Sequence, residues 1–198
     1  MLLQEKIKPF QVFLCSGSPR RHQLLKEIGI PFKIMKDIPF DESYPSTMDA
    51  YKVPVYLAEN KSGQVEINDS EHKNIILTAD TVVILNNSII NKPVDREDAI
   101  KMLQRLSGNK HEVVTGVCLK KSSGSISFSV LTEVYFKTLT NEEIEYYIDQ
   151  YKPYDKAGSY GIQEWIGYIG IDKINGSFYN VMGLPVEKLY TELEQFIL

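Results

Sequence analysis

A turn of small residues followed by two arginines stands near the start of the sequence. Residues 16–21 read SGSPRR, and the glycine spacing fits neither a Walker loop nor a dinucleotide-binding fingerprint. Arg20 and Arg21 would lie in the first turn of a helix, where the helix macrodipole opposes positive charge. A bound anion would reverse that penalty, because Ser16, Ser18 and free backbone N–H groups donate hydrogen bonds and arginine grips phosphate oxygens bidentately. The alternative is that both arginines point into water.

A single carboxylate interrupts a strongly apolar run. Asp80 stands in the segment LTADTVV, residues 77–83, whose other members favour the interior of a sheet. An unpaired buried carboxylate is strongly destabilising, so we expect Asp80 at a strand end or beside a cation, a metal ion or a catalytic cleft. A buried structural ion pair is one interpretation. The functional one is a carboxylate that binds a divalent ion or orders a water molecule.

Three more charged residues could join Asp80. Lys92 follows it across a predicted hairpin, Lys61 ends the preceding predicted helix, and Glu42 lies in an acidic loop. Each residue alone is typical of a solvated surface charge. Two arginines, two lysines, two carboxylates and serine donors together are the set that a metal-assisted attack on a polyphosphate requires.

A glycine-containing segment ends in a glutamine. Residues 154–163 read YDKAGSYGIQ. Backbone that passes close to a ligand would explain the glycines, and the amide of Gln163 can both donate to and accept from a base edge. A plain turn-rich connection is the alternative. Nearby aromatic residues could stack on a base, although such residues are more often part of a core; they are Tyr160, Trp165, Tyr168 and Tyr179.

The elements that position these residues alternate between strands and helices. Apolar runs predict strands at residues 12–15, 75–85, 89–90, 113–119 and 127–137. Helical spacing and capping residues predict helices from Pro19 to before Gly29, near residues 54–62, from Asp95 to before Gly108, over residues 141–151 and over residues 186–196. Polar stretches predict loops at residues 68–73 and 120–125, and Asn86-Asn87 predicts a tight turn. The alternation indicates a mixed α/β fold, and the absence of repeats favours one continuous domain over residues 1–198.

Composition excludes several classes of protein. The chain has 22 Lys and Arg against 26 Asp and Glu, a formal net charge of −4, which argues against a protein that holds duplex nucleic acid. Residues 1–10, MLLQEKIKPF, lack a sustained hydrophobic run, so we expect no signal peptide, and the longest apolar stretch is interrupted by Asp80, so we expect no membrane span. Cys15 and Cys118 share no zinc-type spacing with the three histidines, so we expect buried free thiols in a reducing cytoplasm.

These motifs together resemble the Maf family of nucleoside triphosphate pyrophosphatases. The similar segments span nearly the whole chain: SGSPRR at 16–21, the acidic pair 41–42, ADTVV at 79–83, KP at 92–93, LSG at 106–108, VTGV at 114–117, KAGSYGIQ at 156–163 and NVMGLP at 180–185. The resemblance implies a two-lobed α/β fold, similar to that of inosine triphosphate pyrophosphatase, with a central twisted mixed sheet and the active site in a cleft between the lobes. It also implies a homodimer.

The activity implied by the resemblance is cleavage of a nucleoside triphosphate between its α- and β-phosphates, with Mg²⁺ or Mn²⁺. Asp80 would be the general base and Glu42 would assist it with metal or water. The triphosphate would be held by Ser16, Arg21, Lys61 and Lys92. The sequence leaves open whether Asp80 acts as the base or as a metal ligand, because a metal-bound carboxylate is a weaker base.

Three positions imply the substrate. Arg20, Thr81 and Gln163 match the combination of the family branch that acts on dTTP and UTP, whereas the branch that acts on 7-methyl-GTP carries an aromatic residue in place of the arginine. One amide can complement the O4 and N3–H edge of thymine or uracil and would mismatch cytosine. We therefore expect dTTP and UTP, with modified pyrimidine triphosphates as further candidates. The alternatives are a 7-methyl-GTP pyrophosphatase, a non-catalytic nucleotide-binding regulator of division, and a sugar-nucleotide or phosphate-ester hydrolase that releases orthophosphate.

Overall fold

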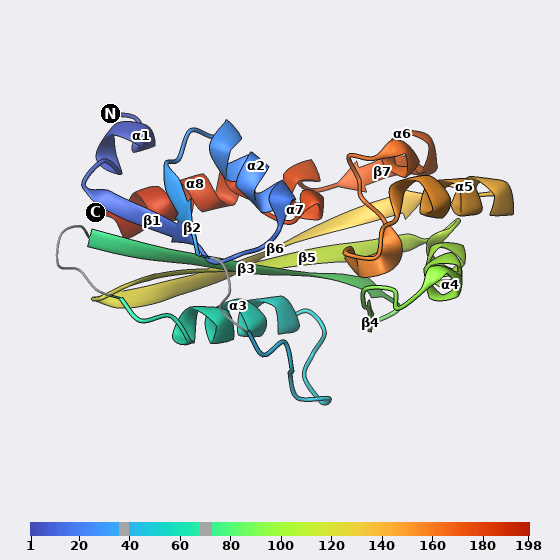
Figure 1. The fold of residues 1–198 in the computed structure, drawn as a ribbon, viewed down its shortest axis with the longest axis horizontal. Helices are drawn as coiled ribbons and strands as arrows, with labels where there is room; N and C mark the ends of the chain where they lie inside the picture. The colour runs from blue at the N-terminus through green and yellow to red at the C-terminus, as the bar shows by residue number, and fades with distance from the viewer. Residues whose placement is uncertain (36–39, 68–72) are drawn as a thin grey trace. The chain divides into compact units, whose positions relative to one another are not determined.

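The computed structural model describes residues 1–35, 40–67 and 73–198 (Figure 1). Its strands form a seven-stranded sheet in the order β2 (Phe32–Ile34), β1 (Phe10–Leu14), β3 (Lys73–Leu85), β5 (Lys110–Lys121), β6 (Gly124–Phe136) and β7 (Ile171–Asn175), with β4 (Ser88–Ile90) paired to β3. Strand β1 is parallel to β2 and β3, whereas β4 is antiparallel to β3 and β7 is antiparallel to β6. The predicted mixed α/β fold is therefore confirmed. Residues 68–72, most of a predicted loop, lie outside the described residues.

The chain divides into two compact units, each built from separate stretches. Unit 1 contains Met1–Asp80, Thr115–Val130 and Gly183–Leu198, and unit 2 contains Thr81–Val114 and Leu131–Met182. Strands β3 (Lys73–Leu85), β5 (Lys110–Lys121) and β6 (Gly124–Phe136) contribute residues to both units. Asp80 is the last residue of β3 that belongs to unit 1.

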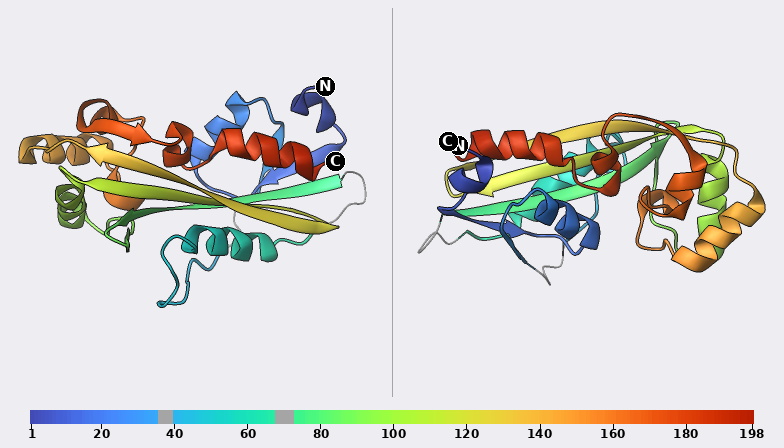
Figure 2. Two further views of the ribbon diagram at one scale, coloured as in Figure 1. Left: turned by 180° about the vertical axis from the view of Figure 1, so that it is seen from behind. Right: turned by 90° about the horizontal axis from the view of Figure 1, so that it is seen from above.

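Unit 1 places helices on both faces of its part of the sheet. Helix α3 covers one face, and α2 and α8 cover the other (Figures 1 and 2). The register pairs Val12 with Phe32 on β2 and with Ile75 on β3. The elements that lie wholly in unit 1 are α1 (Leu3–Lys6), β1 (Phe10–Leu14), α2 (Pro19–Glu27), β2 (Phe32–Ile34), α3 (Val53–Gly63) and α8 (Val186–Phe196).

Local sequence signals explain where these helices begin and end. Ser18 occupies the N-cap position of α2 and Pro19 its first turn, where a fixed φ favours the helix and no N–H is lost. Gly29 then adopts a φ of +71°, which ends the helix in the left-handed region. Helix α3 likewise has Pro54 in its first turn.

Unit 2 opens with a hairpin. Asn86 and Asn87 both adopt positive φ, 51° and 60°, and reverse the chain from β3 into β4 (Ser88–Ile90) as predicted. Asp95 and Thr140 cap the next two long helices through their side chains. The elements that follow β4 wholly within unit 2 are α4 (Arg96–Leu106), α5 (Asn141–Tyr151), a 3₁₀ turn (Ala157–Ser159), α6 (Trp165–Gly170), β7 (Ile171–Asn175) and α7 (Phe178–Met182).

Several boundaries differ from the sequence-based prediction. The loop predicted at residues 120–125 is shorter in the structure, because β5 runs to Lys121, β6 begins at Gly124 and two residues connect these paired strands. The two lysines belong to β5 and Ser125 belongs to β6, while Ser122 and Ser123 form the turn of the hairpin. The short elements α1, β2, α6, β7 and α7 were not predicted, since three to six residues carry too little periodicity to distinguish helix from strand.

The two cysteines and the lengths of the helices bear on the expectations of free thiols and of no membrane span. Cys15 and Cys118 are buried and free, as expected, and burial raises the pKa of Cys15 to about 11. Across the described residues, every helix is too short or too polar to cross a lipid bilayer.

Candidate active site

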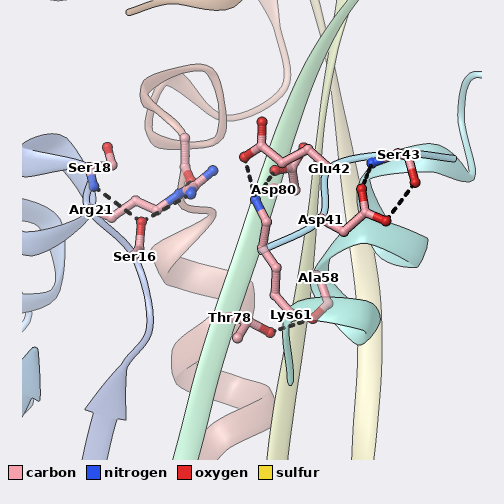
Figure 3. A network of polar contacts seen from close by, with 11 residues as sticks. Ser16, Ser18, Arg21, Asp41, Glu42, Ser43, Ala58, Lys61, Thr78 and Asp80 are labelled. Carbon is pink, nitrogen blue, oxygen red and sulfur yellow. Dashed lines mark hydrogen bonds and ion pairs between the residues drawn. The ribbon is translucent and has the colours of Figure 1, made fainter. Parts of the chain in front are cut away.

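A lysine and two carboxylates meet beside strand β3 (Figure 3). Lys61 Nζ donates to Asp80 Oδ1 at 2.7 Å and to Glu42 Oε1 at 3.0 Å. The Lys61 side chain is only 8% exposed and that of Asp80 15%, whereas Glu42 is 55% exposed. Asp80 therefore lies beside a cation, which is one of the surroundings predicted from the sequence around it. Glu42 forms the solvent-exposed side of this group of three charges.

Helix α3 and its contacts place Lys61 against the sheet. Lys61 lies in the last turn of α3, where a cation also complements the helix macrodipole. Thr78 Oγ1 donates to Ala58 O at 2.6 Å, which fastens the helix to β3 one turn before Lys61. On β5, a Cβ added at Gly116 would lie 2.3 Å from the carbonyl carbon of Pro54. The absence of a side chain at Gly116 thus lets the start of α3 approach the strand.

The loop between β1 and α2 forms a second cluster. Ser16 Oγ accepts from Arg21 Nη1 at 3.2 Å and from the backbone N–H of Ser18 at 3.3 Å. Arg21 Nε donates to Gly183 O at 2.7 Å, and His22 Nε2 lies 2.7 Å from Ser16 O. Arg21 is therefore held by the protein and does not simply extend into water. Both contacts of the Ser16 hydroxyl use it as an acceptor, so its hydrogen can be donated to a ligand.

Electrostatics connect the two clusters. Burial lowers the pKa of Arg21, the charges of Asp80 and Glu42 act in the opposite direction, and the charge of Arg20 adds to the lowering. The guanidinium is thus close enough to feel both carboxylates, and Figure 3 shows it directed toward them. Serine, arginine and lysine donors beside a carboxylate can hold phosphate oxygens and orient a water molecule.

The two carboxylates also suit a divalent ion. Within the part of the chain that the structure describes, no three His, Cys, Asp or Glu side chains gather closely enough to hold a metal by themselves. Mg²⁺ commonly binds one or two carboxylates and takes its other ligands from water and substrate phosphates. Asp80 and Glu42 converge on one lysine nitrogen, and this donor set fits an ion that binds together with a polyphosphate.

The remaining predicted site residues belong to unit 2. Thr81 follows Asp80 on β3, Lys92 follows β4, and Gln163 lies just before α6. Gln163 Oε1 is buried and finds no hydrogen-bond partner among the described residues. The structure therefore brings together Ser16, Arg21, Glu42, Lys61 and Asp80 within unit 1, with Arg20 beside Arg21, and places Thr81, Lys92 and Gln163 in unit 2.

One aromatic candidate for base stacking lies in the core. Tyr160 is 5% exposed, and its ring packs edge-on against His111 and Phe136. Tyr168 and Tyr179 are exposed. The core interpretation is therefore confirmed for Tyr160, because its side chain is buried against two rings of unit 2.

Sequence reasoning missed three groups at the site. They are the backbone carbonyl of Gly183, the ring of His22 and the hydroxyl of Thr78. The position of His22 one residue after the arginine pair is a weak signal. A backbone carbonyl leaves no signal in the residue type, so its contact with Arg21 required the fold.

Comparison with known proteins supplies the family. The family described as Maf-like protein matches residues 11–196. A protein of Parabacteroides distasonis named dTTP/UTP pyrophosphatase is 48% identical over 192 residues, covering 97% of this chain and 99% of the relative. A protein of Porphyromonas gingivalis with the same name is 50% identical over 195 residues, covering 97% of each chain.

A solved structure agrees at the level of the fold. The structure of a HAM1 protein from Coxiella burnetii superposes with a TM-score of 0.50 at 12% identity, covering 94% of this chain and 99% of the other. The match over residues 11–196 and the two full-length relatives lead to the same conclusion. This chain belongs to the Maf family.

Proposed function

We propose that this protein is a pyrophosphatase that hydrolyses dTTP and UTP to the monophosphate and pyrophosphate. One observation carries the proposal: Asp80 and Glu42 converge on the buried Lys61 within the electrostatic reach of Arg21. The names of the relatives at 48% and 50% identity support the same reaction and substrates.

In this proposal some side chains of unit 1 bind the triphosphate and another activates the water molecule. Ser16, Arg21 and Lys61 bind phosphate oxygens, and the ammonium of Lys61 has a third N–H beyond the two it gives to carboxylates. Asp80 orients a water molecule and accepts its proton as the water oxygen attacks phosphorus. The anhydride bond between the α- and β-phosphates breaks, and the positive side chains stabilise the charge on the pyrophosphate that leaves.

A divalent cation is part of the proposal. Glu42 would hold Mg²⁺ or Mn²⁺, with Asp80 as a second ligand in the alternative in which it does not serve as the base, and the ion would neutralise charge on the phosphates. Lys92 in unit 2 is proposed as a further phosphate ligand, and Arg20, Thr81 and Gln163 as the residues that select the base. The buried, unpartnered Oε1 of Gln163 supports the last of these roles.

A role in cleaning the nucleotide pool of the cytoplasm and a homodimeric state belong to the same proposal. Both rest on the resemblance to the family. Light scattering would measure the oligomeric state directly.

The test is pyrophosphate release from a panel of nucleoside triphosphates with Mg²⁺ or Mn²⁺, for the wild type and Asp80→Asn together. The panel contains UTP, dTTP, CTP, 7-methyl-GTP and modified pyrimidine triphosphates. We expect selective release from UTP and dTTP, and loss of nearly all turnover in Asp80→Asn with triphosphate binding largely kept, since the substitution removes charge and hardly changes shape.

Other outcomes of this panel would replace the proposal. Preferred cleavage of 7-methyl-GTP would assign the other family branch, and release of orthophosphate alone would indicate an ester hydrolase. Micromolar binding of UTP without cleavage by either metal would indicate a nucleotide-binding regulator. Turnover of Asp80→Asn within a few-fold of wild type would remove Asp80 from the chemistry.

A further inference from the structure

Gln163 sits in a four-residue turn at the entrance to α6. The N–H of Glu164 donates to the carbonyl of Gly161 at 3.0 Å and closes the turn, with Gln163 as its third residue. Glu164 is also the N-cap residue of α6. The direction of the Gln163 side chain is therefore set by how the two ends of this turn, Gly161 and Glu164, are held.

One hydroxyl contacts both ends of the turn. Tyr147 Oη accepts from the N–H of Gly161 at 3.0 Å and donates to Glu164 Oε2. Tyr147 lies on the buried face of α5, is 0% exposed and stacks its ring on Tyr151. Burial, and then the bond to Glu164, raise the pKa of Tyr147, so the phenol stays protonated and able to donate.

The carboxylate of Glu164 is held from a second side. Lys156 Nζ lies 3.2 Å from Glu164 Oε1, and Lys156 is 8% exposed. A Cβ added at Gly161 would lie 2.8 Å from the carboxyl carbon of Glu164, so the carboxylate packs directly on the α-carbon of this glycine. One connected polar network thus surrounds the turn and is formed by Gly161, Glu164, Tyr147 and Lys156.

The turn holds an acceptor that lacks a donor. Gln163 Oε1 is buried and without a hydrogen-bond partner in the described part of the chain, and leaving such an acceptor unpaired carries a free-energy cost. A ligand N–H placed there would recover that cost. Uracil and thymine carry a donor at N3, whereas N3 of cytosine is an acceptor, so the position of this oxygen separates the two kinds of base.

We propose that Tyr147 is a positioning residue for base selection: its hydroxyl fixes the turn at residues 161–164, so that Gln163 Oε1 meets the N3–H of uracil or thymine. Tyr147 does not touch the nucleotide and acts through Gln163. This inference rests on the proposed dTTP and UTP specificity.

The test measures binding separately from turnover. Tyr147→Phe keeps the ring and removes the hydroxyl that both turn ends contact. We expect calorimetry with the non-hydrolysable α,β-imido analogues of UTP and CTP to show about a tenfold weaker affinity for the UTP analogue, with little change for the CTP analogue. In turnover assays we expect KM for UTP to rise by a similar factor, while kcat stays within about twofold.

Tyr190→Phe is the matched control. Tyr190 Oη likewise bridges a backbone N–H and a side-chain acceptor, since it accepts from Leu3 N at 3.1 Å and donates to Gln4 Oε1 at 3.4 Å, but it does so in unit 1. We expect this variant to keep the wild-type preference between the two analogues. Glu164→Gln retains an acceptor for Tyr147 and should keep more of the preference than Glu164→Ala does.

Two results would overturn the inference. One is an unchanged preference in Tyr147→Phe, and the other is an equal weakening for both analogues. If Tyr147→Phe does not fold, as judged by thermal melting, the comparison of Glu164→Gln with Glu164→Ala decides, because equal preference in these two variants overturns it as well. If the wild type bound the UTP analogue selectively and never released pyrophosphate, the proposed reaction would fail while the role of Tyr147 stood.

Discussion

At the scale of single residues, Lys61 is a buried cation that depends on its neighbours. Its charge is shared by Asp80, which is nearly as buried, and by Glu42, which is half exposed. Loss of Asp80 leaves Lys61 with Glu42, whereas loss of Lys61 leaves the Asp80 carboxylate without the cation that contacts it. The cost of breaking a buried pair therefore depends on which partner is removed.

This asymmetry gives a stability prediction. Lys61→Met should lower the free energy of unfolding by about 3 kcal/mol and Asp80→Asn by about 1 kcal/mol, because the first removes the cation in direct contact with Asp80 whereas the second leaves Lys61 paired with Glu42. The double variant should be more stable than the sum of the two losses predicts. Urea unfolding of all four proteins measures this cycle. Strictly additive losses would show that the pair is not energetically coupled.

At the scale of elements, strand β5 and helix α3 depend on a close backbone approach. The start of α3 lies so near Gly116 that a methyl group there would overlap the backbone of Pro54 and Val55. Backbone cannot move aside as a flexible side chain can. The same helix carries Lys61, so displacement at its first turn would reach the candidate site through its last turn.

Gly116→Ala should therefore affect both stability and activity. We expect a loss of about 2–3 kcal/mol in the free energy of unfolding, typical of overpacking, and reduced pyrophosphate release. Gly63→Ala is the control, because a Cβ at Gly63 at the end of α3 meets nothing within 4 Å. Urea unfolding and the pyrophosphate assay measure both variants. Equal behaviour of the two glycines would refute the close-approach argument.

The long helices and strands were predictable from the sequence because their apolar residues recur at regular spacing and their ends carry capping or turn residues. Helix α5 shows a capping box at Thr140 and a periodic apolar face, and the two asparagines before β4 accept the left-handed conformation that a tight hairpin needs. The same periodicity marks Tyr147 only as a core residue. Its contacts with both ends of a turn, 14 and 17 residues later, depend on tertiary structure that periodicity does not encode.

The candidate site was predictable as a set of residue types, and its pairings were not. The apolar run around Asp80 predicted a strand end, a cation, a metal ion or a catalytic cleft at this carboxylate, and the structure shows the cation of Lys61 there. The sequence offered no reason to prefer Lys61 over Lys92 for this contact. Contacts made by backbone atoms, such as the hydrogen bond from Arg21 to the carbonyl of Gly183, cannot be predicted from residue types because every residue has a carbonyl.

At the scale of the whole molecule, the buried residue His111 contributes to the pH dependence of folding. His111 is 1% exposed, its Nε2 lies 2.7 Å from Tyr160 Oη, and burial lowers its pKa to about 3 from the usual 6.5. The unfolded chain binds a proton at this residue below pH 6.5, whereas the folded chain does so only near pH 3. His111 therefore contributes stability above pH 6.5 that is lost as the pH falls toward 3.

His111→Gln should flatten that dependence. Between pH 8 and pH 5 the wild type should lose about 2 kcal/mol more stability than the variant, as the linkage relation requires for these two pKa values. Urea unfolding of both proteins at several pH values measures the difference. Parallel curves for the two proteins would contradict neutral burial of His111.

The way unit 1 is assembled has a consequence for protein synthesis. Arg21 donates to the carbonyl of Gly183, a residue 162 positions later, and α1 is tied to α8 by the pair Lys6 and Glu194 at 2.7 Å. A ribosome makes the chain from the N-terminus, so β1 and α2 leave the exit tunnel long before these partners exist. A nascent chain stalled before Gly183 would present Arg21 without its carbonyl acceptor, and the Ser16–Arg21 cluster would reach its final form only after Gly183 has emerged.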